Sequence, residues 1–173
     1  MRTTHFAPRA LLLAIVIATF CGHSALQAED RNGLLFNVAK KTLSREDGPN
    51  MDYAKEIARD LVLKATLKNI SMKDREPGSV EYSILIRRWG GEIGSTQRYS
   101  GTVPLTALKR GQEVEVNSGQ FHIGGHLHGT SRIHVDELEA WKFIVIIGDQ
   151  KTEFRSSAKF DVLDKKATPA PAK

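Results

Sequence analysis

Apolar residues in this chain recur at every second position over long stretches. In DLVLKATLKNI the odd positions from 61 to 67 are Leu or Ala, and the even positions from 64 to 68 are Lys or Thr. SVEYSILIRRW repeats this pattern, with apolar residues or Tyr at positions 80, 82, 84 and 86. Such alternation predicts strands with one buried face, because successive side chains of a strand point to opposite sides. We expect these two stretches to be partners in one sheet.

Further strand signals lie between short turn signals along the rest of the chain. The strand candidates are LLFNVAKKTL, QRYSGTVPL, QEVEVNS, AWKFIVIIG and TEFRSSAKFDV, and the turns include EDGPN, KDREPGS, WGGE and IGDQK. Strands with this spacing and no alternation with helices predict an all-β, antiparallel sandwich of about seven or eight strands, of the immunoglobulin-like type. Trp141 and Phe143 are predicted core residues, because AWKFIVIIG is apolar at nearly every position.

One stretch also fits a short helix. In MDYAKEIARDL, Tyr53, Ile57 and Leu61 are spaced four apart, and Asn50 could cap a helix near residues 51–59. The pattern alone leaves helix and strand open here.

Two stretches resemble immunoglobulin-like sandwiches of bacterial exported proteins. In LVLKATLKNIS a strand ends in an Asn-x-Ser turn, and in VPLTALKRGQEVEV a Leu-containing loop with a Gly precedes an alternating run. The resemblance concerns the fold of residues 32–163. Such domains have many different functions, so the resemblance does not choose among them.

The first residues have the features of a secretory signal. Arg2 and Arg9 precede an apolar run that is too short to span a bilayer, and small residues lead to LQA, which predicts a signal peptide over residues 1–28. We therefore expect a secreted or periplasmic protein without a transmembrane span. Cys21, the one cysteine, would leave with the signal peptide. Lipidation at Cys21 is the alternative, but Phe20 fits it poorly.

The predicted mature chain forms one domain, residues 29–163, followed by a disordered tail, residues 164–173, that is rich in Pro and Ala. Loss of Arg2 and Arg9 lowers the formal net charge from +5 to +3. So mild a charge argues against a nucleic-acid partner.

Four histidines lie in FHIGGHLHGTSRIHVD. If GTSRI is a hairpin loop, His128 lies opposite His134 and His126 lies opposite Asp136, so that four ligands for zinc, copper or nickel converge. A shorter loop keeps His126 opposite His134 but loses Asp136. The alternative interpretation is a Gly-rich exposed loop without a metal.

A second candidate site surrounds the Gly-rich turn in RRWGGEIGSTQRYSG. Arginines beside aromatic rings could bind a protein or glycan partner; the candidates are Arg87, Arg88, Trp89, Arg98 and Tyr99. The alternative is a solvated strand face.

The chain contains no phosphate-binding loop, nucleophile elbow or zinc-protease motif. We therefore expect an exported, non-catalytic binding or structural protein without a cofactor, and metal binding at the histidines is the alternative function. The sequence leaves the partner and the oligomeric state open.

Overall fold

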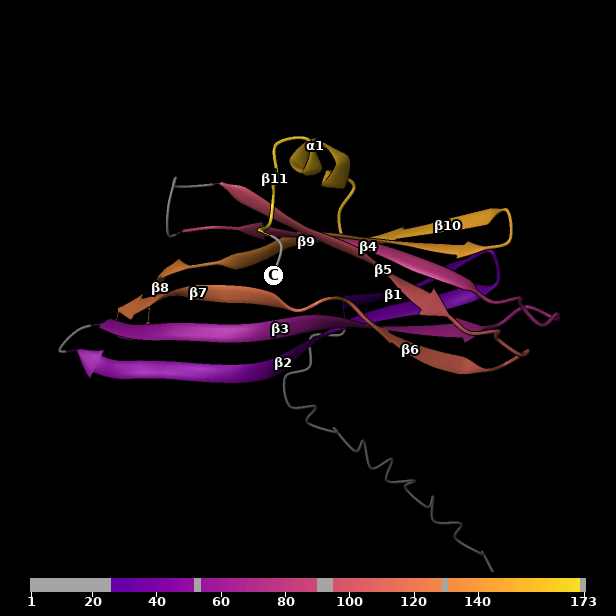
Figure 1. Cartoon of the computed structure of the whole chain (residues 1–173), viewed down its shortest axis with the longest axis horizontal. Coiled ribbons are helices and arrows are strands. Elements are labelled where there is room, and N and C mark those ends of the chain that lie inside the picture. Colours follow the sequence, from indigo (N-terminus) through magenta and orange to yellow (C-terminus); the bar gives the residue numbers. More distant parts are fainter. Residues whose placement is uncertain (1–25, 52–53, 90–94, 129–130, 172–173) are drawn as a thin grey trace, which may run out of the picture.

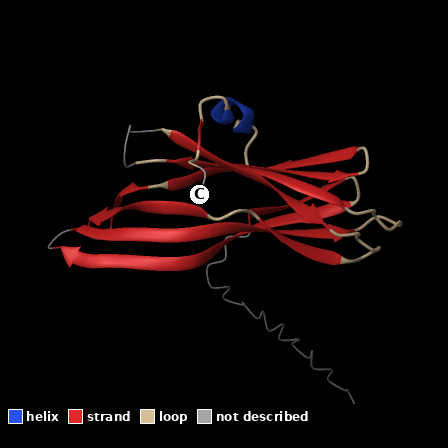
Figure 2. Ribbon diagram, viewed as in Figure 1, coloured by secondary structure: helices blue, strands red, loops and turns tan. Residues whose placement is uncertain are grey.

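The computed structural model describes residues 26–51, 54–89, 95–128 and 131–171. Strands dominate it (Figure 2). They are β1 (Leu26–Arg31), β2 (Leu34–Met51), β3 (Ala54–Asn69), β4 (Gly78–Arg87), β5 (Thr96–Leu105), β6 (Glu113–Asn117), β7 (Phe121–His128), β8 (Ser131–Val135), β9 (Glu137–Ile147), β10 (Gln150–Arg155) and β11 (Thr168–Pro169). One short helix, α1 (Phe160–Asp164), follows β10.

The strands form two sheets, which lie one above the other in Figure 1. The first sheet has the order β1-β2-β3-β7-β8, with β6 also paired to β3, and the second has the order β10-β9-β4-β5-β11. All pairs are antiparallel except the short parallel pair of β11 and β5. The prediction of an all-β sandwich is confirmed. The described residues hold more strands than expected, partly because FHIGGHLH forms β7 and is not a loop.

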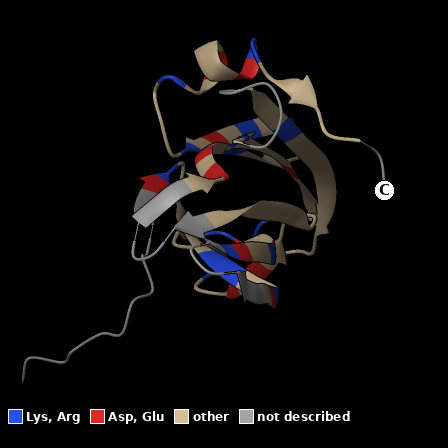
Figure 3. Ribbon diagram, turned by 90° about the vertical axis from the view of Figure 1, so that its left-hand side faces the viewer, with Lys and Arg blue, Asp and Glu red and all other residues tan. Residues whose placement is uncertain are grey.

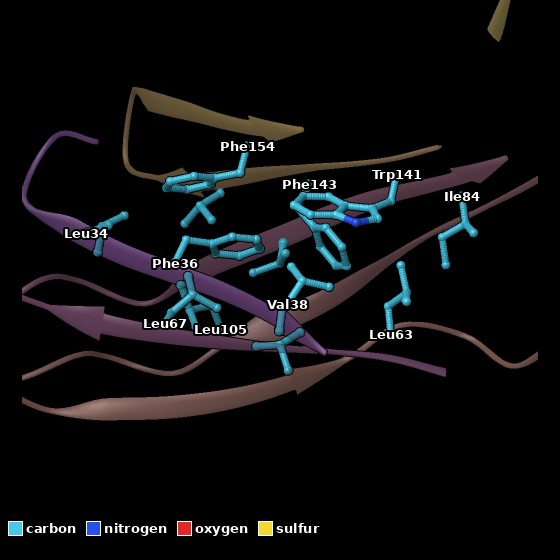
Figure 4. Packing of buried hydrophobic residues seen from close by; sticks show 14 of the residues in the cluster. Leu34, Phe36, Val38, Leu63, Leu67, Ile84, Leu105, Trp141, Phe143 and Phe154 are labelled. Atoms are coloured by element: carbon cyan, nitrogen blue, oxygen red, sulfur yellow. The ribbon is translucent and has the colours of Figure 1, made fainter. Parts of the chain in front are cut away.

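The core lies between the two sheets and is rich in aromatic rings. Phe36 of β2 stacks on Phe154 of β10 with ring centroids 4.3 Å apart, and its centroid lies 5.4 Å from that of Phe143 of β9. Figure 4 shows Trp141 beside these rings. Trp141 is 2% exposed and Phe143 is 0% exposed, which confirms both as core residues. Each buried side chain of this kind contributes about 1.5–3 kcal/mol.

The two alternating stretches are not sheet partners, contrary to our prediction. Stretch 60–70 belongs to β3 in the first sheet and stretch 79–89 belongs mainly to β4 in the second. Their apolar faces, including Leu63 and Ile84, meet across the core. Alternation identifies the buried face of a strand, but carries no information about which strand lies beside it.

The helix considered near residues 51–59 is wrong, because β3 runs without interruption from Ala54 to Asn69. Ile57 and Leu61 are both buried on one face of this strand. A spacing of four residues returns to the same face in a strand as well as in a helix, so it could not separate the two. Tyr53 lies outside the described residues.

The structure describes the segment after residue 164 as far as residue 171, where the sequence predicted a disordered tail, and this segment lies against the second sheet. Phe160 of α1 is buried against Leu85 and Ala140 on the outer side of the second sheet. Thr168 and Pro169 then pair with β5, and the amide N–H of Ala170 donates to the carbonyl of Arg98 at 2.8 Å. A single aromatic anchor and a short edge pairing fix this segment, and neither produces a periodic pattern.

Asn69 joins the two stretches that resemble exported sandwich domains. Its side chain is fully buried, and its Nδ2 donates to the carbonyls of Lys73 (2.9 Å) and Leu108 (3.0 Å). Its Oδ1 accepts from the backbone N–H (3.1 Å) and the hydroxyl (2.7 Å) of Ser71. The Asn-x-Ser turn and the Leu-containing loop therefore hold each other in place.

The predicted signal peptide lies almost entirely outside the described residues. Residues 26–28 form the start of β1, and Glu29, Asp30 and Arg31 pair with β2. Cleavage after Ala28 would keep these three pairs. Among the described residues, no helix is long and apolar enough to cross a membrane.

Candidate functional site

Asp136 lies at the point where the chain passes from one sheet to the other. It is the single residue between β8 of the first sheet and β9 of the second, and it is 9% exposed. Its carboxylate accepts hydrogen bonds from Arg88 Nη1 (2.5 Å) and from the backbone N–H groups of Trp89 (2.9 Å) and Gly124 (3.0 Å). These donors come from both sheets, so Asp136 ties the sheets together.

Arg88 directly follows β4 and is held by several partners besides Asp136. Its Nε donates to Oε1 of Gln97 at 2.7 Å, and its Nη1 also donates to the carbonyl of His122 at 2.9 Å. Its Nη2 donates to the hydroxyl of Tyr99. A guanidinium engaged in this way orders the end of the sandwich, and little of its donor capacity is left for a ligand.

A half-open pocket of about 420 Å³ lies beside this ion pair, where β7 and β8 meet the ends of β4 and β5. The ring of Trp89 contacts the ring of His134 edge-on, with centroids 5.9 Å apart. The pocket is lined by Arg88, Trp89, Ser95, Gln97, Gly124, Gly125, His126, His134, Asp136 and Thr168. The lining therefore combines the ring of Trp89 with polar side chains and with the ion pair of Arg88 and Asp136, whose charges offset each other.

The predicted metal set is brought together only in part. His126 lies directly opposite His134, as in the shorter-loop alternative, and both residues line the pocket. Asp136 instead binds Arg88 and two backbone amides, and His128 pairs with Ser131 through the backbone. Among the described residues, no three His, Cys, Asp or Glu side chains are placed to hold an ion. The side chain of His128 lies outside the description.

The predicted partner-binding set does not form one surface. Arg88 and Tyr99 bond to each other within the fold. Arg87 forms an ion pair with Glu139 at 2.6 Å, and this hydrogen-bonded carboxylate raises the pKa of Arg87. Arg98 forms an ion pair with Asp164 of α1 at 3.2 Å. Of this set, Arg88 and Trp89 line the pocket, and Trp89 is the aromatic side chain there.

No sequence pattern indicated the other polar residues of the pocket, which are Ser95, Gln97 and Thr168. Gly125 is a sequence signal that could have predicted where the neighbouring strand β8 lies. Its φ is +151°, and a Cβ at this position would overlap the backbone of His134 and Val135 on β8. Glycine inside a strand often marks such a close approach of another backbone. The Gly-Gly pair in FHIGGHLH therefore indicated where β8 crosses β7.

A second polar cluster lies on β2, β3 and β7. Asp60 lies opposite His122, and its Oδ1 is 3.2 Å from His122 Nδ1. The hydroxyl of Ser44 donates to Oδ2 of Asp60 at 3.0 Å. Hydrogen bonds from Gln120, His122 and Ser44 lower the pKa of Asp60, which keeps the carboxylate ionised. Asp60 and His122 are 62 residues apart, so only the strand register brings them together.

Figure 3 views the molecule from the left-hand side of Figure 1 and shows Lys and Arg interspersed with Asp and Glu over the strands. Lys64 and Glu115 form one further ion pair between β3 and β6.

Comparisons with known proteins give no family. No family model matches the chain, and no curated protein sequence matches it. A crystal structure of a protein from Akkermansia muciniphila is similar with a TM-score of 0.38 and 10% identity, over 83% of this chain and 84% of that one. The solution structure of R. palustris CsgH is similar with a TM-score of 0.31 and 14% identity, over 73% of this chain and 97% of that one. Both similarities are low.

Proposed function

We propose that this chain is an exported, non-catalytic binding protein whose ligand occupies the pocket beside Trp89. The observation that carries the proposal is the pocket itself, which has about 420 Å³ of space and a mixed aromatic and polar lining. Pockets that bind small ligands combine apolar contact area with a few fixed polar groups. The exported location rests on the signal-like residues 1–28.

The lining favours a neutral, polar ligand. Arg88 and Asp136 neutralise each other, so the pocket offers little net charge to an ion. Ser95, Gln97 and Thr168 offer hydroxyl and amide groups, and Trp89 offers a flat apolar surface with a polar N–H. A sugar unit of a glycan matches this combination, since it has hydroxyl groups at its edge and C–H groups on its faces.

A binding role is favoured over catalysis by the geometry of the polar groups. Ser44 is a hydroxyl beside an imidazole and carboxylate pair, but it donates to Asp60 and not to His122. A serine nucleophile needs the imidazole between itself and the carboxylate, as the proton acceptor. In this cluster Asp60 lies between Ser44 and His122, so the imidazole is not placed to accept the proton of the serine hydroxyl.

Calorimetric titration of the mature chain, residues 29–173, with a panel of neutral mono- and oligosaccharides tests the proposal. Trp89→Ala should weaken binding at least tenfold, because it removes the aromatic wall. Met72→Ala is the matched control, since Met72 is 78% exposed and is not among the pocket residues. Absence of binding by every sugar, or equal affinity in wild type and Trp89→Ala, would contradict the proposal.

Metal binding is the second candidate function. The observation in its favour is that His126 and His134 lie directly opposite each other on adjacent strands.

A further inference from the structure

One side of the pocket is formed by the end of the chain. Thr168 of β11 lines the pocket beside Gln97 of β5, and these two residues are direct partners in the parallel pair of β11 and β5. The other lining residues lie between positions 88 and 136 of the chain. Thr168 is therefore brought to the pocket by a later segment, residues 165–171, which we call the strap.

The strap follows a helix that is firmly anchored. Phe160, the first residue of α1, is fully buried against Leu85 and Ala140, and Nζ of Lys142 lies 4.6 Å from the centroid of its ring. In Figure 1 the yellow segment passes from α1 down the edge of the second sheet. The helix is thus a fixed point from which the strap reaches β5.

The contacts of the strap with β5 are few and exposed. β11 pairs with two of the ten residues of β5, and Thr168 and Pro169 are both exposed. The N–H of Ala170 donates to the carbonyl of Arg98 at 2.8 Å, and Asp164 forms an ion pair with Arg98 at 3.2 Å. Exposed pairs contribute little stability, and segments with few buried contacts open locally more readily than the core. The strap can therefore leave β5 while α1 stays in place.

The hydroxyl of Thr168 suits a ligand that carries hydroxyl groups. It donates to the carbonyl of Thr96 at 3.4 Å, which leaves the lone pairs of its oxygen as acceptors. The side chain is exposed and lines the pocket, so a ligand in the pocket can reach it.

We propose that the strap is a movable wall of the ligand site, and that Thr168 is a binding residue that accepts a hydrogen bond from a hydroxyl group of the bound sugar. This inference rests on the proposed function, because it assigns a further residue to the same pocket. A sugar that contacts both Thr168 and the sheet residues joins the strap to β5, so binding holds the strap in place. Release of the strap opens one side of the pocket and speeds dissociation of the sugar.

Calorimetric titration of the mature chain, residues 29–173, with neutral sugars tests the role of Thr168. Thr168→Val removes the hydroxyl and keeps the shape of the side chain, so binding should weaken by about three- to tenfold, the usual effect of one hydrogen bond. Thr168→Ser restores the hydroxyl and should recover most of this loss. Val162→Ala is the control, since Val162 lies on α1, is 60% exposed and is not among the pocket residues.

Ala170→Pro tests whether the strap is a movable wall. Proline lacks the N–H that donates to Arg98, so this variant loosens the strap and leaves the lining side chains unchanged. We expect the sugar to dissociate about threefold faster or more, as for the loss of one hydrogen bond. In the wild type, hydrogen exchange at the amide of Ala170 should be fast without ligand and should slow when sugar saturates the pocket.

The outcomes separate this inference from the proposed function. If no sugar binds the full mature chain, the proposed function fails and the inference fails with it. If sugars bind and Trp89→Ala weakens binding, but Thr168→Val binds as tightly as the wild type, the inference alone is overturned. Exchange at Ala170 that does not change on binding would also overturn it. Circular dichroism of each variant checks that the fold is intact.

Discussion

Arg88 and Asp136 form an ion pair that joins the two sheets at the residue where the chain crosses between them. Asp136 is 9% exposed and the Arg88 side chain is 18% exposed, so water weakens this pair far less than it weakens a surface pair. Both residues of the pair also line the pocket, so the contact that holds the two sheets together also helps to shape the candidate site.

Asp136→Ala should destabilise the protein by about 3 kcal/mol, because it leaves Arg88 and two backbone N–H groups without their acceptor. The loss stays at the low end of the range for buried pairs, since Arg88 keeps Gln97 and Tyr99 as partners. Urea unfolding measures the effect. Glu137→Ala, at the next and exposed position, is the control and should stay within about 0.5 kcal/mol of the wild type. Equal stability of the two variants would show that the pair does not join the sheets.

Asn69→Ala should cost about 2–3 kcal/mol, because it removes four hydrogen bonds of a fully buried side chain: two donated to the carbonyls of Lys73 and Leu108, and two accepted from the N–H and the hydroxyl of Ser71. The change in free energy of unfolding can be compared with that of Ile70→Ala, which truncates a neighbouring side chain that is 44% exposed. If the two variants were equally stable, Asn69 would not hold the turn and the loop together.

Gly101→Ala should destabilise the second sheet through a steric overlap with Tyr82. A Cβ on Gly101 would overlap the hydroxyl of Tyr82, and overpacking of this kind costs about 1–3 kcal/mol. Tyr82→Phe removes that hydroxyl, so the double variant should recover part of the loss. A double-mutant cycle from thermal or urea unfolding tests this coupling, and strict additivity would argue against it.

Acid should loosen the contact of α1 with the second sheet. Lys142 and Arg155 each lie 3.1 Å from an oxygen of Asp161, and these partners, Lys142 first, lower the pKa of Asp161 below its ordinary 3.8. The stabilisation by this carboxylate is therefore complete above about pH 4 and is lost as the pH falls through the lowered pKa. Melting temperatures from pH 7 to pH 2 should fall more steeply for the wild type than for Asp161→Asn. Parallel curves would contradict this assignment.

The alternation of apolar residues was sufficient to predict the all-β class and the buried face of each long strand. It placed Leu63 and Ile84 inward correctly, but it could not show that they meet across the core. Partner choice depends on how distant segments pack, and a period of two is the same for every pairing. Helix α1 was not predicted for a different reason, since its position depends on Phe160 packing against Leu85 and Ala140, which are distant in the sequence.

Individual residues of the candidate site could be predicted from the sequence, but their arrangement in space could not. The sequence pointed to His126, His134 and Trp89 as separate features, and the structure places all three at one pocket. Asp136 was expected to bind a metal, yet its three donors come from Arg88, Trp89 and Gly124. The register of the β7 and β8 pair decides this outcome, and it depends on the close approach at Gly125, which the hydrophobic pattern does not encode.

The two tryptophans of the chain allow the most direct test of the proposed function. Trp89 lines the pocket, whereas Trp141 is 2% exposed in the core, so one indole N–H reports on the pocket and the other is an internal control. The measurement is a titration of the ¹⁵N-labelled mature chain with neutral sugars, followed through its two indole signals. We predict that the Trp89 signal shifts in a saturable way while the Trp141 signal stays fixed. An unchanged Trp89 signal, or equal shifts of both signals, would contradict it.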